Sequence, residues 1–259
     1  MSTKLTIIAG VNRSGNQENF GEFTLTSGET ISIVGPTGSG KTAFISDIEL
    51  LAQQDTTTKR QVLLNGKVPS DSIRFNPALK PIAMITQNTK CFADLPVADF
   101  LSIHARARGI ANQSVIADTI DLANIFTGEK IHGKHKVTTL SGGQTRSLLI
   151  ADAILIGAAP IILLDEIENA GIFKQEVIGV IQDTGKIIVF VTHDPVIALH
   201  TNKRLIMENG GVKKVIYQNE TEMFAARKLV ELDKRMGTIR EELRAGNIIT
   251  SELAKVNFA

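Results

Sequence analysis

Short apolar runs alternate with segments of helical spacing along most of this chain. Two runs, Ile161–Leu164 and Ile187–Val191, are continuously apolar, which is typical of strands buried on both faces of a parallel sheet. Further β-type runs are expected at Leu5–Ile8, Glu22–Leu25, Thr30–Val34, Gln61–Leu64 and Ile82–Ile85. Helical patterns occur after Lys41, over Val97–Ala107 and Gln113–Ala123, after Gly142, and over Ile172–Gln182. Strands that alternate with helices in this way predict an α/β core.

The rest of the chain contains two helical regions without strand signals. The segment from Asn88 to Thr139 is expected to form a helical insert. Near the C-terminus an apolar stripe recurs at spacings of 4, 3, 4, 3 and 4 over Ala225, Leu229, Leu232, Met236, Ile239 and Leu243. It predicts an amphipathic helix that ends near Gly246–Asn247. We therefore expect an α/β domain over residues 1–218, with a helical subdomain at about 88–150, and a helical extension over residues 219–259.

The C-terminal stripe has two interpretations. The favoured one is that it packs on the surface of the chain's own α/β domain. The alternative is a contact with a second copy or another partner. Gly237 interrupts the heptad spacing, whereas coiled coils usually sustain about three or more heptads.

Composition narrows the class of protein. The 259 residues are 43% hydrophobic and 21% charged, which describes a globular chain, and a net charge of +1 gives no electrostatic reason to expect nucleic acid as a partner. The longest apolar stretch, Ala153–Leu164, is broken by Gly157 and Pro160 and is shorter than the ~20 residues that span a bilayer. The single Cys91 fits a reducing compartment. We expect a cytoplasmic protein, which could lie on the cytoplasmic face of the inner membrane through another chain.

The most specific motif is GPTGSGKT at Gly35–Thr42, which matches G-x-x-x-x-G-K-[ST] between a strand and a helical segment. In such a loop, backbone N–H groups converge on phosphate oxygens at a helix N-terminus. Lys41 is expected to reach the β- and γ-phosphates, and the Thr42 hydroxyl is expected to ligate Mg²⁺. The expected nucleotide-binding residues are Gly35, Pro36, Thr37, Gly38, Ser39, Gly40, Lys41, Thr42 and Ala43.

Polar residues also follow three of the other predicted strands. Asp165 ends the run IILL and is placed to hold Mg²⁺, and Glu166 is placed to orient and deprotonate a water molecule. Gln87 and His193 close two further runs. Because ligands bind outside the carboxyl ends of parallel strands, we expect Gln87 and His193 to face the γ-phosphate side of the site.

Five motifs follow one another in order along the chain: Gly35–Thr42, Gln87, LSGGQ at Leu140–Gln144, LLDE at Leu163–Glu166 and VTHD at Val191–Asp194. In this order and spacing, over roughly residues 5–216, the chain resembles an ATP-binding cassette (ABC) ATPase domain. The resemblance implies an α/β fold of the P-loop NTPase class, with a mixed sheet core, a small antiparallel β subdomain and a helical insert. It also implies Mg²⁺-dependent hydrolysis of ATP to ADP and phosphate.

The resemblance assigns roles to individual residues. Lys41, Glu166 and His193 would be catalytic, with Glu166 as the general base and His193 on the γ-phosphate. The Mg²⁺ site would be formed by Thr42, Gln87 and Asp165. The chain would act as a head-to-tail dimer with a second cassette, a homodimer being favoured. In that dimer, the residues that act across the interface would be Ser141, Gly142, Gly143 and Gln144.

Several positions depart from the family pattern. Ala43 stands where a second hydroxyl is usual, and Ser147 and Asp152 replace two arginines after LSGGQ. The turn after Glu166 reads Ile167 and then ENAG, where Pro and a Ser-Ala-Leu-Asp turn are common. Communication between the two sites is therefore expected to be altered, although hydrolysis is expected to remain.

The adenine side of the site also departs from the pattern. An aromatic residue is expected about 25 residues before Gly35, but that neighbourhood is Val11–Asn12, and Phe20 and Phe23 lie too close to the loop. Stacking on an aromatic side chain contributes ~1–3 kcal/mol per base in nucleic-acid complexes. Weaker nucleotide affinity or looser base discrimination is therefore expected.

Two functions remain open at this point. One is the energising subunit of a membrane transporter, which would dock a permease through the helical insert; this follows from family analogy. The other is a soluble ATPase that remodels or activates a cytoplasmic complex, which the departures at Ser147, Asp152 and the ENAG turn would suit. Nucleic acid is not expected as a partner.

Overall fold

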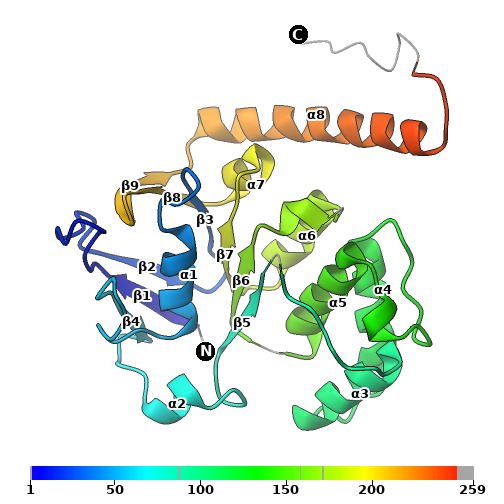
Figure 1. Cartoon of the computed structure of the whole chain (residues 1–259), viewed down its shortest axis with the longest axis horizontal. Coiled ribbons are helices and arrows are strands. Elements are labelled where there is room, and N and C mark those ends of the chain that lie inside the picture. Colours follow the sequence, from blue (N-terminus) through cyan, green and yellow to red (C-terminus); the bar gives the residue numbers. More distant parts are fainter. Residues whose placement is uncertain (1, 87, 158, 171, 250–259) are drawn as a thin grey trace.

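The computed structural model describes residues 2–86, 88–157, 159–170 and 172–249, and it is built around a six-stranded sheet (Figure 1). The strand order is β5-β6-β7-β3-β8-β9. The strands are β3 (Thr30–Val34), β5 (Ile82–Ile85), β6 (Ile161–Asp165), β7 (Ile187–Val191), β8 (Lys203–Glu208) and β9 (Gly211–Tyr217). The first five run parallel and β9 pairs with β8 in antiparallel fashion, so the predicted mixed sheet is confirmed.

The central strands are the ones that the apolar runs predicted. All five residues of β7 and the first four of β6 are buried, because helices cover both faces of the sheet. By contrast, β8 and β9 were not predicted. They lie at one side of the sheet, and the charged residues Lys203, Arg204 and Glu208 limit the apolar run of β8 to three residues, Leu205–Met207, which is too short to stand out.

A second, three-stranded antiparallel sheet confirms the predicted β subdomain. Its order is β2-β1-β4, from β1 (Lys4–Ile8), β2 (Glu22–Thr26) and β4 (Gln61–Leu64). Its apolar face packs against helix α1 (Lys41–Glu49), where Leu5 and Leu25 share one buried cluster with Phe44 and Ile45. Helix α1 is therefore fixed between the two sheets.

The predicted helical insert is also confirmed. It contains α3 (Val97–Ala107), α4 (Ser114–Ile125), η1 (Val137–Thr139) and α5 (Gly142–Leu155), and a short α2 (Asp71–Phe75) precedes it. The buried carboxylate of Asp152 on α5 lies 2.8 Å from Nδ1 of His104 on α3, and Ser147 is fully buried. These two departures from the family pattern therefore lie on the buried side of α5.

Three further helices complete the fold: α6 (Lys174–Asp183), α7 (Pro195–His200) and the long C-terminal α8 (Glu220–Arg244). Figure 1 shows α8 lying across the top of the molecule over α7. Helix α8 continues through Gly237, and Gly246 follows its end with φ = 77°, as the sequence predicted.

The face that α8 packs on the α/β domain combines part of the predicted stripe with the residues next to it. The half-buried residues of the stripe are Ala225, Leu229, Leu232 and Ile239. Ala226 is buried, the Val230 carbonyl accepts a hydrogen bond from Gln175 on α6, and Asp233 pairs with Lys174 at 3.5 Å. Met236 and Leu243 of the predicted stripe remain 49% and 60% exposed. The helix therefore lies on its own domain, packed on α7 and joined to α6 by polar contacts.

Truncation after Tyr217 tests how much this packing stabilises the domain. The shortened chain should still fold, with its free energy of unfolding lowered by about 1–3 kcal/mol, because one buried side chain and two part-buried ion pairs are lost. Urea unfolding of the two lengths measures the difference, and Ala226→Asp should mimic truncation while Leu243→Asp on the exposed side should not. Equal stability with loss of self-association would assign the helix to a partner contact instead.

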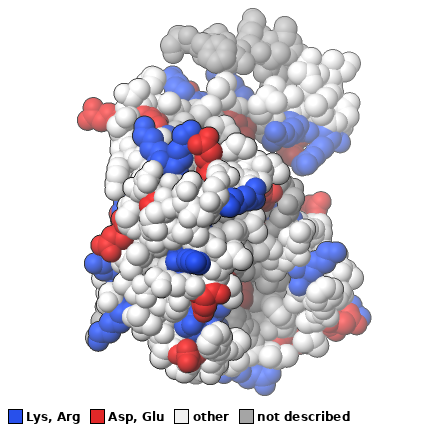
Figure 2. Space-filling model, turned by 60° about the vertical axis from the view of Figure 1, so that its left-hand side comes forward, with Lys and Arg blue, Asp and Glu red and all other residues white. Residues whose placement is uncertain are grey.

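The surface carries charges of both signs in small groups. Figure 2 shows Lys and Arg side chains interspersed with Asp and Glu on one face, in keeping with the net charge of +1. Within the part of the chain that the structure describes, no helix is both long enough and apolar enough to span a bilayer.

Candidate active site

The predicted phosphate loop, Gly35–Thr42, connects β3 to the first turn of α1. Gly40 precedes the helix with φ = 103°, and a Cβ there would lie 2.7 Å from Cα of Gly210 in the β8–β9 turn. Only glycine fits this position, because both the left-handed backbone and the close approach exclude a side chain. The Gly210 N–H also donates to the Ser39 carbonyl at 2.8 Å, so the turn supports the loop from behind.

Lys41 lies across the phosphate loop. Its Nζ donates to the carbonyls of Gly35 at 2.8 Å and Pro36 at 3.1 Å, and the residue is 7% exposed. Ser39 Oγ is buried without a hydrogen-bond partner among the described residues. A buried cation and an unpaired hydroxyl at the N-terminus of α1 form an arrangement suited to an anionic ligand.

A cavity of about 280 Å³ opens beside this loop at the carboxyl ends of the parallel strands. Its lining joins Lys41 and Thr42 to Asp165, Glu166 and His193, as predicted. The full lining is Thr37, Gly38, Lys41, Thr42, Thr86, Asn88, Asp165, Glu166, Val191 and His193. The predicted Gln87 lies outside the described residues. Thr86 and Asn88 were not predicted, because no motif singles them out.

Asp165 ends β6 in a strongly polarised environment. Burial raises the pKa of its carboxyl group, and the charges of Glu166 and Glu168 raise that pKa further, whereas Lys41 lowers it. A carboxylate that is already disfavoured by its surroundings gains from a nearby divalent cation. Thr42 and Asp165 are hard oxygen donors on one cavity, so this donor set fits Mg²⁺.

Glu166 has a backbone conformation that is rare for its residue type. Its φ is 50°, and its N–H donates to the Val191 carbonyl at 2.9 Å. This bend at the end of β6 turns the chain out of the sheet. Oε1 of Glu166 then lies 3.5 Å from Nε2 of His193, which follows β7. Backbone strain of this kind is concentrated at functional sites.

The segment Leu140–Gln144, which we call the signature segment, begins helix α5. Ser141 caps the helix: its Oγ accepts from the Gln144 N–H at 3.3 Å, and Gln144 Oε1 accepts from the Ser141 N–H at 2.9 Å. Ser141 and Gly142 are exposed, and Gly143 is half-buried. Ser141, Gly142, Gly143 and Gln144 are all absent from the described lining of this chain's own cavity.

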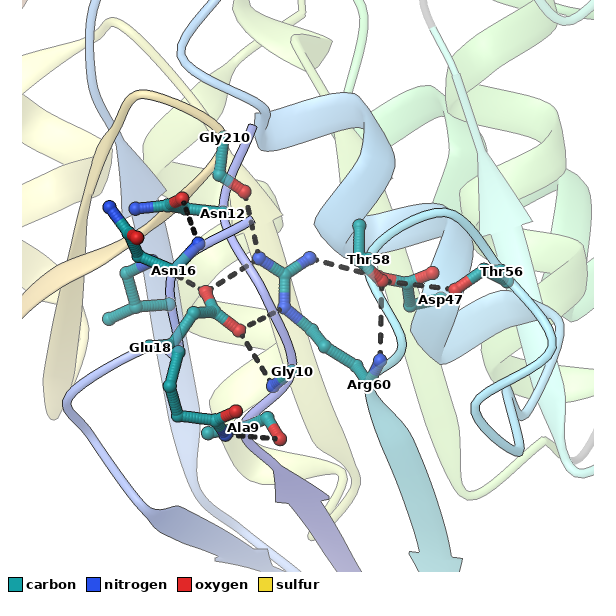
Figure 3. A network of polar contacts seen from close by, with 12 residues as sticks. Ala9, Gly10, Asn12, Asn16, Glu18, Asp47, Thr56, Thr58, Arg60 and Gly210 are labelled. Atoms are coloured by element: carbon teal, nitrogen blue, oxygen red, sulfur yellow. Dashed lines mark hydrogen bonds and ion pairs between the residues drawn. The ribbon is translucent and has the colours of Figure 1, made fainter. Parts of the chain in front are cut away.

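Beneath the phosphate loop lies a buried ionic network that the sequence did not reveal (Figure 3). The fully buried Arg60 forms two hydrogen bonds with Glu18, at 2.7 and 2.8 Å, and one with Asp47 of α1 at 2.9 Å. It also donates to the Gly210 carbonyl at 3.0 Å. The network therefore fixes α1 and the β8–β9 turn, which together support Ser39 and Gly40.

Comparison with known proteins agrees with this geometry. The chain matches the family model described as ABC transporter over residues 20–169. An uncharacterized ABC transporter ATP-binding protein of Methanocaldococcus jannaschii is 45% identical over 249 residues, which cover 96% of this chain and 95% of that protein.

Two solved structures share the fold. The first, cbiO1 from Clostridium perfringens, is described as part of the ABC transporter complex cbiONQ, with a TM-score of 0.62 and 21% identity over 91% of this chain and 98% of that one. The second is a dimeric ATP-binding cassette in a post-hydrolysis state bound to ADP and Pi, with a TM-score of 0.59 and 21% identity over 83% of this chain and 99% of that one.

The phosphate loop, the acids at the end of β6 and His193 after β7 thus surround one cavity, in a chain that the family model matches over more than half its length. This chain belongs to the ABC transporter family, as an ATP-binding subunit that hydrolyses ATP to energise transport.

Proposed function

We propose that two copies of this chain associate head to tail, so that the signature segment of each copy completes the nucleotide site of the other. The observation that carries this proposal is the exposure of Ser141 and Gly142 at the start of α5, away from the lining of their own cavity. The first N–H groups of a helix have no intrahelical acceptor, and the positive end of the helix favours an anion. A phosphate presented by a second copy satisfies both conditions.

Within each cavity, this chain's own groups divide the work of hydrolysis. Lys41 holds the β- and γ-phosphates, Glu166 accepts a proton from the attacking water, and His193 contacts the γ-phosphate. Thr42 and Asp165 would hold Mg²⁺, which would neutralise charge on the phosphate oxygens. Because the site is complete only when both copies close, hydrolysis is coupled to a movement of the dimer.

The movement is passed to a membrane permease on the cytoplasmic face, to which the subunit binds peripherally. The extensive similarity to an ABC transporter ATP-binding protein supports this role over that of a soluble remodelling ATPase. Co-purification from a detergent extract distinguishes the two: a polytopic membrane partner supports the permease, and a purely soluble partner supports the alternative.

A complementation experiment tests the shared site. Lys41→Ala removes the cation from the phosphate loop, and Ser141→Arg places a bulky side chain on the signature segment, so each homodimer should lack ATPase activity. A heterodimer of the two variants, isolated through two different affinity tags, contains one site that carries neither change. We expect ATP hydrolysis to return in part when the variants are paired.

The matched control pairs Lys41→Ala with Glu166→Gln. Both residues belong to the same half of the site, so every site in that heterodimer is defective and no activity should return. If Lys41→Ala paired with Ser141→Arg also remained inactive, or if Ser141→Arg were fully active alone, the head-to-tail arrangement would be wrong.

A further inference from the structure

Glu168 links the loop that follows β6 to the loop that follows β7, and both loops contribute residues to the catalytic cavity. It lies in the 3₁₀ turn η2 (Ile167–Ala170), just after β6. Its Oε1 accepts hydrogen bonds from the Thr192 hydroxyl at 2.6 Å and from the His193 N–H at 2.9 Å, both of which follow β7. One carboxylate oxygen thus joins the loop that follows Glu166 to the loop that carries His193.

The His193 side chain depends on this backbone support. The side chain is 47% exposed, so packing against neighbours does not determine its position. Its backbone is held from both sides: Glu168 accepts the His193 N–H, and the Thr192 hydroxyl accepts the next N–H, that of Asp194, at 2.9 Å. Asp194 in turn caps α7 by accepting from the Val196 N–H at 2.8 Å. Loss of the Glu168 contact would remove the hydrogen bond that holds the His193 N–H in the loop between β7 and α7.

The second carboxylate oxygen of Glu168 lowers folding stability in this arrangement. Oε2 of Glu168 is buried and has no hydrogen-bond partner among the described residues. A buried acceptor without a partner is unfavourable, and Asp165 and Glu166 bring further negative charge nearby. A carboxylate in this position therefore contributes little to folding stability by itself. Its two hydrogen bonds to Thr192 and His193 instead indicate that it positions the loop after β7.

We propose that Glu168 is a positioning residue for ATP hydrolysis: its Oε1 holds the loop at Thr192–His193 so that the imidazole of His193 faces Glu166 and the γ-phosphate. This inference rests on the proposed role of His193 at the γ-phosphate. Glu168 itself does not touch the reacting atoms. What matters is the reach and the acceptor capacity of the side chain, because both bonds end on a single oxygen.

Three substitutions separate reach from charge. Glu168→Gln keeps the length and one acceptor oxygen but loses the charge, Glu168→Asp keeps the charge but is one methylene shorter, and Glu168→Ala loses both. We expect kcat to fall about 10- to 100-fold in Ala and Asp, because small displacements of catalytic groups have effects of this size, and less than about threefold in Gln. The KM for ATP should change little, since the phosphate loop, which holds most of the phosphate oxygens, forms no hydrogen bond with the Glu168 side chain within the described part of the chain and is unchanged in these variants. Glu231→Ala, an exposed acid on α8, is the control.

A double substitution tests whether the effect passes through His193. Glu168→Ala should lower kcat in the wild-type background but change it less than about twofold in the His193→Ala background, because the imidazole to be positioned is already gone. Equal losses in both backgrounds would overturn the inference and assign Glu168 a general structural role. Full activity of His193→Ala would instead overturn the proposed role of His193, and the inference with it.

The proposal can still be tested if Glu168→Ala does not fold. If Glu168→Ala does not fold, as judged by its thermal unfolding, the pair Gln and Asp decides the question. Higher kcat in Gln than in Asp supports positioning through reach, and higher kcat in Asp than in Gln overturns it in favour of a role for the charge.

Discussion

Replacing Glu166 with glutamine is expected to stop ATP turnover while leaving ATP binding intact. Glutamine has the same shape, and the Glu166 N–H bond to the Val191 carbonyl keeps the backbone bend in place. The amide accepts no proton from the attacking water, so phosphate release at saturating ATP should fall about 10²- to 10⁴-fold, the usual contribution of a general base. Steady-state phosphate release and nucleotide-binding measurements on the same sample check both parts.

The same variant should also accumulate in the ATP-bound dimer, because hydrolysis no longer reopens it. Gel filtration with and without Mg·ATP would show a shift from monomer to dimer for Glu166→Gln that the wild-type protein does not retain. Glu176→Gln, a change to an exposed acid on α6, is the matched control and should keep normal turnover. Normal turnover in Glu166→Gln would remove Glu166 from the role of general base.

Replacing Arg60 with methionine is expected to destabilise the domain by about 3–5 kcal/mol, because it leaves two buried acids without a counter-charge. Glu18 and Asp47 are both buried, and Arg60 is their shared partner. Methionine fills much of the same volume, so the loss reports the charge more than a cavity. Urea unfolding measures it. Arg244→Ala, which removes an exposed pair with Glu241, should cost less than about 0.5 kcal/mol.

Neutralising the partners should recover much of this loss. Glu18→Gln and Asp47→Asn keep acceptor oxygens for the Gly10 N–H and the Thr58 hydroxyl while removing both buried charges. The triple variant with Arg60→Met should therefore be more stable than Arg60→Met alone. If Arg60→Met and the triple variant both unfolded at the same urea concentration as the wild-type protein, the network would have no part in stability.

Most residues around the catalytic cavity were predictable because they carry a local signal, which Thr86 and Asn88 lack. Gly35–Thr42 is a contiguous motif, and Asp165, Glu166 and His193 follow continuous apolar runs. Strands of that kind lie parallel in a buried sheet, so their carboxyl ends meet at one edge. Glu168 carries no such signal: it appears in the sequence only as a departure within the ENAG turn, and its partners lie 24 and 25 residues further on.

Contacts between distant segments were not predictable either, because no local sequence signal marks the residues that form them. Arg60 and Glu18 are 42 residues apart, and Glu18 accepts the Val212 N–H across 194 residues. Charged residues usually lie on the surface, so nothing local indicates that these are buried. His104 and Asp152 meet only because α3 packs beside α5. The strands β8 and β9 were missed because charged residues such as Arg204 and Lys214 interrupt their apolar runs.

The C-terminal helix α8 shows most clearly what the local sequence determines and what the tertiary structure decides. Its spacing and its final glycine determined that residues 220–244 form a helix, because helix formation depends on neighbours three and four residues apart. Which face of α8 meets the domain depends on α7, on which the helix packs, and on Lys174 and Gln175 of α6, all of which the helix meets only in the folded chain. The sequence by itself thus determined most of the elements and the ATP chemistry at the strand ends, whereas the tertiary structure decided which distant side chains hold that chemistry in place.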